Sequence, residues 1–281
     1  MEKNSNENEM GCKFHRILMF FVPLLYALET RFLKRSKLGA IVWATEFLLP
    51  TIIALWLVKY NFAEWHYWIV SILSVYNLYE IGYIQNDCET IKREQTPTLR
   101  VSTKELLFYE KWKYSIYGLR FLLGLLGSVF FLYHGSNFSH ILIFWLIVPI
   151  YAIYNYLRGR VNLYLIFLLT SYRYCMPLIL VCDIAKSDNM EIILAVLVVY
   201  PVLKLIEICA GGKSLPQERW TKIFMANYES RFVFRIKYYF CLTILFVVFQ
   251  LVGHANLFWL LPAYFFLLRG CQWKMPKLGA R

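Results

Sequence analysis

Residues 39–58, GAIVWATEFLLPTIIALWLV, decide the fold class of this chain. These 20 residues hold a single charged side chain, Glu46, near the middle of the run. The hydrocarbon core of a bilayer is about 30 Å thick and is crossed by about 20 apolar residues in a helix. The stretch therefore predicts a transmembrane helix.

The same pattern recurs along most of the chain. Of its 281 residues, 59% are hydrophobic and 17% are charged, whereas charged residues make up about a quarter of an ordinary soluble domain. The composition predicts an all-α, polytopic integral membrane helix bundle, and it excludes a soluble enzyme. The predicted spans are residues 39–58, 65–85, 116–133, 138–157, 161–183, 190–209, 235–253 and 255–269.

A shorter apolar stretch precedes the first span. Residues 17–28 are interrupted by Pro23 and have basic residues on both sides. Because positive charge marks the cytoplasmic side, we expect this stretch to lie in the membrane interface and not to cross the bilayer. The predicted organisation is a cytoplasmic N-terminus with this interfacial segment (1–38), a transmembrane domain (39–269) and a cytoplasmic tail (270–281).

Lysines and arginines are distributed unevenly between the two sides. Of the 30 in the chain, only Lys59 and Lys186 fall in the predicted outer connections, Arg173 lies within a span, and the others are assigned to the cytoplasmic face. This pattern predicts a multi-pass membrane protein with both termini cytoplasmic. The net charge of +12 then follows from topology and attracts anionic lipids or phosphorylated substrates, and it does not indicate nucleic-acid binding.

Acidic residues recur where the second predicted span leaves the membrane. Residues 79–100 read YEIGYIQNDCETIKREQTPTLR, and Glu80, Asp87 and Glu94 follow one another at seven-residue steps. At about 100° per residue, these three acids fall on one face of a helix. The sequence therefore predicts an acidic stripe at the inner end of this span.

Carboxylates stacked on one face repel one another unless a cation lies between them. The oxygen atoms of Asp, Glu and Asn suit Mg²⁺, and Asn86 lies on the same side as the acids. The alternative is an internal ion pair with Arg158, Arg160 or Arg173. From these residues alone, both a magnesium site and an arginine pair stay open.

Two motifs resemble those of the UbiA superfamily of intramembrane transferases. Asn86-Asp87 followed by Glu94 resembles the first aspartate-rich motif of that superfamily, NDxxDxxxD, with Thr90 in the place of the second acid. Residues 154–160, YNYLRGR, resemble its YSxxLKR element, with the Tyr-to-Leu spacing one residue shorter.

Further likenesses favour one branch of the superfamily. Arg173 resembles the membrane-embedded arginine of the branch that makes decaprenyl-phosphate phosphoribose, and Lys204 and Glu207 are similar to residues near that branch's second long connection. The second aspartate-rich motif of the prenyl-transferring relatives is missing, because residues 189–281 contain no aspartate. Residues 39–269 follow the superfamily's order of helices and motifs.

The resemblance implies a UbiA-like fold of eight to nine transmembrane helices, with residues 39–269 as a transmembrane transferase domain. It further implies a Mg²⁺-dependent transferase of the cell envelope, in a bacterial inner membrane. Such an enzyme moves phosphoribosyl from phosphoribosyl diphosphate to a polyprenyl phosphate taken from the membrane. The resemblance further implies that Asn86, Asp87 and Glu94 are catalytic and that, with Glu80, they hold Mg²⁺. The implied substrate-binding residues are Tyr83, Arg100, Lys104, Arg158, Arg160, Arg173, Lys204 and Glu207.

Two other functions stay open. A UbiA-type prenyltransferase would move an isoprenyl group from its diphosphate to an aromatic or other lipid acceptor, and Glu207, Glu218 or Glu229 would then replace the missing aspartates. A catalytically degenerate relative would act as a membrane partner or carrier, with Thr90 marking lost metal chemistry.

Overall fold

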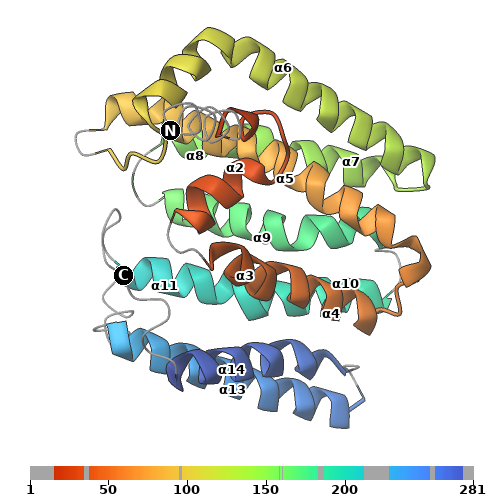
Figure 1. The fold of residues 1–281 in the computed structure, drawn as a ribbon. Helices are drawn as coiled ribbons and strands as arrows, with labels where there is room; N and C mark the ends of the chain where they lie inside the picture. The colour runs from red at the N-terminus through yellow and green to blue at the C-terminus, as the bar shows by residue number, and fades with distance from the viewer. Residues whose placement is uncertain are drawn as a thin grey trace, which may run out of the picture. The chain divides into compact units, whose positions relative to one another are not determined.

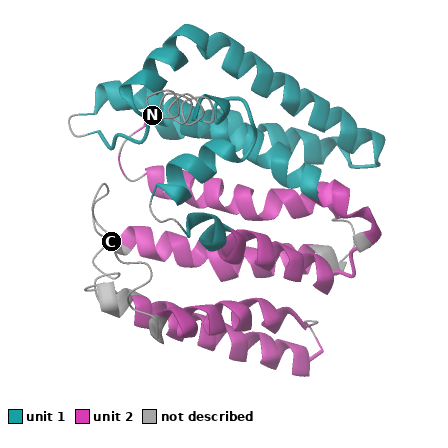
Figure 2. Cartoon of the chain, viewed as in Figure 1, with its two compact units in different colours: residues 1–43, 69–156 teal, residues 44–68, 157–281 magenta. Residues whose placement is uncertain are grey.

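The computed structural model describes residues 16–34, 38–94, 97–157, 159, 161–182, 187–211, 228–253 and 257–274 (Figure 1). Every regular element in these ranges is a helix, so the predicted all-α class is confirmed there. The chain divides into two compact units (Figure 2). Unit 1 is Met1–Trp43 with Ile69–Tyr156, and unit 2 is Ala44–Trp68 with Leu157–Arg281.

Six helices within the described ranges are long and apolar enough to cross a membrane. They coincide with six of the predicted spans, and they identify a multi-pass membrane protein. The six are Gly39–Leu57, Thr103–Tyr133, Phe138–Tyr156, Val161–Val181, Met190–Cys209 and Phe232–Leu251.

The other two predicted spans are helical but fall short of these criteria. Residues 65–85 belong to α5 (Trp65–Cys88), which is long enough but is made less apolar by side chains such as Asn77 and Glu80. Residues 255–269 overlap an apolar helical segment, Leu257–Gln272, that is shorter than the other spans. A total of eight to nine transmembrane helices therefore stays a prediction.

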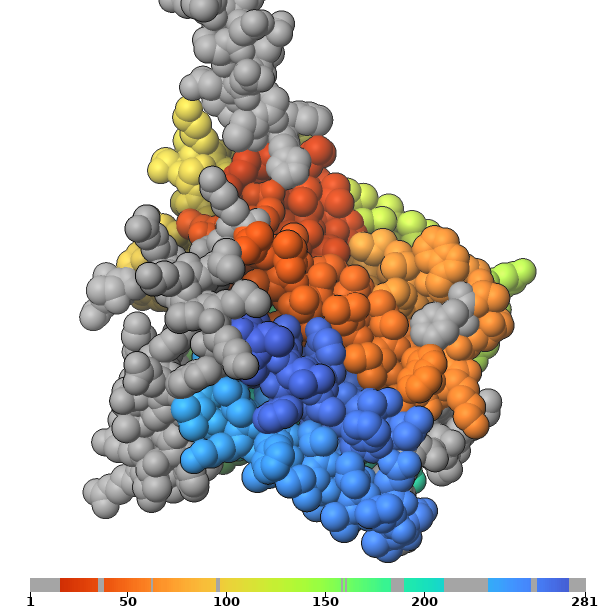
Figure 3. Space-filling model, turned by 60° about the horizontal axis from the view of Figure 1, so that its bottom comes forward, coloured from red at the N-terminus to blue at the C-terminus, as the bar shows by residue number. Residues whose placement is uncertain are grey.

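Unit 2 combines helices from an early and a late part of the sequence, 44–68 and 157–281. Its last two long helices pack against each other (Figure 3, blue). The rings of Tyr239 and Phe265 stack with their centroids 5.1 Å apart. Its elements are η2 (Ala44–Leu48), α4 (Leu49–Leu57), η3 (Phe62–Glu64), α9 (Val161–Val181), α10 (Ser187–Leu197), η5 (Val198–Val202), α11 (Leu203–Gly211), α13 (Tyr228–Leu251), η6 (Leu257–Trp259) and α14 (Leu260–Lys274).

Unit 1 is built around α5 and a longer helix, α6, which begins well before the predicted span. Its start is set by a capping box, in which the Ser102 hydroxyl accepts from the Glu105 backbone N–H and the Glu105 carboxylate accepts from the Ser102 backbone N–H. Besides α5, the elements of unit 1 are α2 (Leu25–Ala27), η1 (Leu28–Leu33), α3 (Gly39–Trp43), η4 (Thr90–Arg93), α6 (Thr103–Tyr133), α7 (Phe138–Trp145) and α8 (Ile147–Tyr156).

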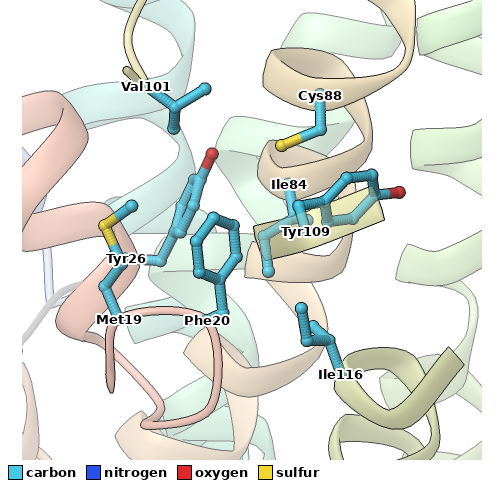
Figure 4. Close-up of a cluster of buried hydrophobic side chains, with 8 residues drawn as sticks. All are labelled: Met19, Phe20, Tyr26, Ile84, Cys88, Val101, Tyr109 and Ile116. Carbon is cyan, nitrogen blue, oxygen red and sulfur yellow. The ribbon is translucent and has the colours of Figure 1, made fainter. Parts of the chain in front are cut away.

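The core of unit 1 includes the N-terminal stretch that was predicted to lie in the interface. Met19, Phe20 and Tyr26 are fully buried and pack with side chains from α5 and α6, including Ile84 and Tyr109 (Figure 4). This stretch is therefore held between two long helices of its unit. Its depth in a bilayer stays a prediction.

Candidate functional site

Asp87 lies one residue before the end of α5 and is fully buried. Its Oδ1 accepts hydrogen bonds from Arg31 Nη2 at 3.0 Å and from Arg100 Nη1 at 3.1 Å. Its Oδ2 accepts from the Tyr26 hydroxyl at 3.2 Å. Two cations and a hydroxyl therefore compensate the loss of water around one carboxylate.

Arg31 is placed against Asp87 by η1. Its guanidinium also lies 4.3 Å from the ring centroid of Tyr83, in a cation–π contact. Burial works against its charge, but the Asp87 carboxylate raises the pKa of Arg31 above its ordinary value. Burial and the same carboxylate raise the pKa of Tyr26 well above its ordinary value, so Tyr26 remains a hydrogen-bond donor.

Arg100 reaches Asp87 from the segment that precedes α6. Lys34 holds this segment by donating to the backbone carbonyls of Leu99 and Arg100 at 2.8 and 3.0 Å. The side chain of Arg100 is 28% exposed, against 13% for Arg31 and none for Asp87. The cluster of Arg31, Arg100 and Asp87 thus opens toward the surface at Arg100, and it carries one more positive than negative charge.

Glu80 is also fully buried on α5, but it has its own cationic partner. Arg120 Nη1, on α6, donates to Glu80 Oε2 at 2.8 Å. The Glu80 carboxylate also accepts from the backbone N–H groups of Leu24 at 3.1 Å and Ala27 at 2.6 Å. Glu80 therefore accepts hydrogen bonds from the backbone of the N-terminal stretch and holds it against α5.

Arg120 completes this arrangement from the other side. It is fully buried, and it donates to the backbone carbonyls of Met19 at 3.1 Å, Phe20 at 2.9 Å and Asn77 at 3.2 Å. The N-terminal stretch turns here, with Leu24 in the left-handed region at φ 73°. Because irregular backbone inside a membrane protein must find internal hydrogen-bond partners, Glu80 and Arg120 stabilise this turn.

The predicted acidic stripe is therefore divided. Glu80 and Asp87 are both on α5 but are held by different arginines. Glu94 is not on that helix, because α5 ends at Cys88, and Glu94 follows η4 in extended backbone. Thr90, which stands in the place of the second acid, is buried within η4.

The carboxylates of Glu80 and Asp87 do not fit a Mg²⁺ site as they are arranged. Both oxygens of Asp87 accept from nitrogen or hydroxyl donors, and so do both oxygens of Glu80. The described residues contain no group of three or more His, Cys, Asp or Glu side chains that could hold a metal ion. The local arrangement is that of carboxylates paired with arginines, which was the alternative left open by the sequence.

The arginines that form these pairs differ from the ones expected. Arg158 and Arg160 lie outside the described residues, and Arg173 is on α9, in unit 2. The actual partners are Arg31, Arg100 and Arg120. Arg100 was predicted only as a substrate-binding residue, and Arg31 and Arg120 were missed. Arg31 belongs to a basic run that was interpreted only as a topological signal, and Arg120 was assigned to the cytoplasmic face although it lies within a predicted span. An arginine in an apolar span is itself a functional signal, and it could have identified Arg120.

Of the other predicted residues of unit 1, Tyr83 and Asn86 belong to the surroundings of Asp87 and Lys104 is not seen in contact with it. Tyr83 contacts Arg31, and Asn86 Nδ2 donates to Asp87 Oδ1 at 3.2 Å. Lys104 is exposed in the first turn of α6. Structure thus brings Tyr83, Asn86, Asp87 and Arg100 together.

The predicted residues of unit 2 belong to other surroundings. The Arg173 guanidinium lies 5.3 Å from the ring centroid of Tyr174. Glu207 pairs with Lys204 at 3.5 Å and also with Arg235, which the sequence did not single out. Glu218 lies outside the described residues, and the side chain of Glu229 is not described.

Comparison with known proteins adds no relative: no family model, curated protein or solved structure matches the chain. The resemblance to the UbiA superfamily therefore rests on the short motifs around Asp87 and residues 154–160.

Proposed function

We propose that this protein is a UbiA-like membrane transferase that acts on phosphate-bearing substrates at the arginine cluster around Asp87. In its preferred form, it moves phosphoribosyl from phosphoribosyl diphosphate to a polyprenyl phosphate. The observation that supports this is the pairing of two guanidiniums with one buried carboxylate, which leaves net positive charge beside a partly exposed arginine. Arginine suits this task because its fixed fork of N–H donors matches phosphate oxygens.

Each residue of the cluster has a defined part in this proposal. Arg100 donates to Asp87 through Nη1, so the rest of its guanidinium is available to a diphosphate. Arg31 is more buried and is fixed by Asp87 and Tyr83, so it supplies a stationary positive charge. Asp87 is a positioning residue that sets the direction of both guanidiniums.

The transfer itself needs one bond to form and one to break. An oxygen of the lipid phosphate attacks the anomeric carbon of the ribose, and the bond from that carbon to the diphosphate oxygen breaks. Negative charge develops on the leaving diphosphate, where Arg31 and Arg100 would stabilise it. Prenyl transfer would place the same charge on the same leaving group, so the cluster alone does not choose between the two donors.

The first experiment identifies the donor. Membranes containing the protein are incubated with labelled phosphoribosyl diphosphate or labelled isoprenyl diphosphate, and label in extracted lipid is measured with and without a chelator. We expect label from the phosphoribosyl donor to enter lipid. Loss of this signal on chelation would show that transfer needs Mg²⁺, held by the diphosphate of the donor or by Asp87. Label from neither donor would contradict a transferase.

The second experiment tests the arginine cluster. Arg100→Gln removes a guanidinium from Asp87, and we expect transfer to fall at least about tenfold because a charge-assisted contact to phosphate is lost. Arg93→Gln is the matched control, because Arg93 is an exposed arginine on neighbouring η4. Equal activity of the two variants would refute the assignment of Arg100.

Asp87→Asn shows whether diphosphate is bound by the arginines or by a metal held at Asp87, because the two cases change its affinity in opposite directions. The Asp87 carboxylate competes with an incoming phosphate for Arg100, so replacing it by an amide should strengthen binding of inorganic diphosphate in the absence of metal. If donor binding instead depended on a metal held by Asp87, the same variant would weaken diphosphate binding in the presence of Mg²⁺. Isothermal titration with and without Mg²⁺ measures both.

A second candidate is a non-catalytic membrane partner or carrier. It is favoured by Thr90 at the position of an acid and by the engagement of Glu80 and Asp87 with arginines. This candidate predicts that diphosphate or lipid phosphate binds at Arg100 while no label is transferred from either donor.

A further inference from the structure

A second group of charged side chains lies within unit 2, where α13 and α14 pack together. Tyr239 and Phe265 stack between these helices. Arg235 is four residues before Tyr239 on α13, and Arg269 is four residues after Phe265 on α14. Because residues four apart share a helix face and consecutive helices joined by a short connection run antiparallel, the two arginines lie at the same level of this helix pair.

Each arginine is held by an acid from a different helix. Arg269 Nη1 lies 2.8 Å from Glu46 Oε1, on η2, and Arg235 Nε donates to Glu207, on α11. Lys204 adds a third cation, 3.5 Å from Glu207. Three cations therefore face two carboxylates, and the cluster has an excess positive charge.

Two hydrogen-bond donors in this cluster are buried without an acceptor in the described part of the chain. They are the hydroxyl of Tyr239, whose residue is fully buried, and Nε of Arg269, whose residue is 6% exposed. Tyr239 lies one helical turn from Arg235 on α13, and its ring stacks on Phe265, which lies one turn from Arg269 on α14, so Tyr239 belongs to the same cluster. Buried donors are normally paired, and leaving two of them beside excess positive charge indicates a place for an anionic acceptor.

The cluster is open at one end. Side-chain exposure rises from 8% at Arg269 to 28% at Arg235 and 43% at Lys204. An anion could therefore enter beside Lys204 and reach the buried donors of Arg269 and Tyr239.

We propose that unit 2 binds a phosphate group at Lys204, Arg235, Tyr239 and Arg269, with Glu46 and Glu207 positioning the two arginines. A phosphate has several acceptor oxygens and up to two negative charges, which matches three cations and a hydroxyl donor. The group is carried by an anionic lipid or is free phosphate. This site shares no residue with the cluster around Asp87, so it does not depend on the function proposed above.

Tyr239→Phe is the test, because it removes only a hydroxyl that has no acceptor within the described residues. The full-length protein in detergent is titrated with phosphatidic acid, phosphatidylcholine or inorganic phosphate, and the thermal unfolding midpoint is followed by tryptophan fluorescence. We expect a saturable rise of the midpoint with phosphatidic acid or inorganic phosphate and none with phosphatidylcholine. Tyr239→Phe should keep the midpoint of the unliganded protein and raise the apparent Kd at least about tenfold, because it loses a hydrogen bond to a charged acceptor.

Tyr238→Phe is the matched control. The Tyr238 hydroxyl donates to the Val198 carbonyl, so this variant should lower the midpoint and leave the apparent Kd unchanged. A response to phosphatidic acid alone assigns the site to a lipid headgroup, and a response to inorganic phosphate assigns it to the free ion. An equal Kd for Tyr239→Phe and wild type, or no saturable shift with either phosphate source, overturns the proposal.

Discussion

Replacing Arg120 tests whether the N-terminal stretch is held by a buried polar network. Arg120 and Glu80 are both fully buried, and their Nη1 and Oε2 atoms lie 2.8 Å apart. Arg120→Met keeps much of the side-chain volume but removes the cation and its bonds to the carbonyls of Met19 and Phe20. Breaking one partner of a buried pair costs about 3–5 kcal/mol, because the other charge is left uncompensated.

The size of the effect can be measured as a midpoint of thermal unfolding. At about 2–4 °C per kcal/mol for a chain of this size class, Arg120→Met should lower the midpoint by on the order of 10 °C. Glu80→Gln should have a similar cost. The double variant restores charge balance, so its cost should be smaller than the sum of the two single variants by about 2 kcal/mol or more.

A local measurement separates this network from general damage to the fold. Hydrogen exchange at the backbone N–H groups of Leu24 and Ala27 should accelerate in Glu80→Gln and in Arg120→Met, since the Glu80 carboxylate accepts from both. Arg93→Met controls for the loss of an arginine at an exposed site. Additive single-variant costs, or unchanged exchange at Leu24 and Ala27, would refute this account of Glu80 and Arg120.

Packing and capping in unit 1 give two further predictions. A Cβ at Gly82 would lie 2.0 Å from the ring of Tyr151, so Gly82→Ala should destabilise the protein by about 2–3 kcal/mol. A Cβ at Gly118 would have no atom within 4 Å, so Gly118→Ala should be neutral or stabilising by up to about 1 kcal/mol. A similar change of the thermal unfolding midpoint in both variants would contradict the close approach of α5 to α8. Ser102→Ala should cost about 1 kcal/mol through loss of the bond to the Glu105 N–H, measured as a lower midpoint and as faster exchange in the first turn of α6; unchanged exchange there would rule out the cap.

The helices that span the membrane could be predicted because they depend on local composition. Runs such as residues 190–209 are apolar over about the length that a bilayer requires, whatever their neighbours are. The pairing of charges could not be predicted in this way. Arg31 and Asp87 are 56 residues apart in sequence, and Glu80 and Arg120 are 40 apart, so only the packed unit shows which arginine meets which acid.

The acidic stripe shows how far periodicity can be used. Seven-residue spacing correctly places Glu80 and Asp87 on one helix, because α5 is continuous between them. The same spacing is wrong for Glu94, since the helix ends at Cys88 and η4 and an extended residue follow. The apolar run of a span can be recognised in the sequence more easily than the residue at which its helix ends.

Glu80 and Asp87 also differ in whether a substrate can change their partners. The partners of Glu80 are two backbone N–H groups and Arg120, which is fully buried and committed to backbone carbonyls, so releasing Glu80 would dismantle the turn at Leu24. Asp87 pairs with Arg31 and with Arg100, which is partly exposed and can exchange the carboxylate for a phosphate while Arg31 still holds Asp87. Of the two buried acids of α5, Asp87 is therefore the one whose arginine partners a substrate can change. Glu80 is a structural residue that no proposed ligand needs to reach.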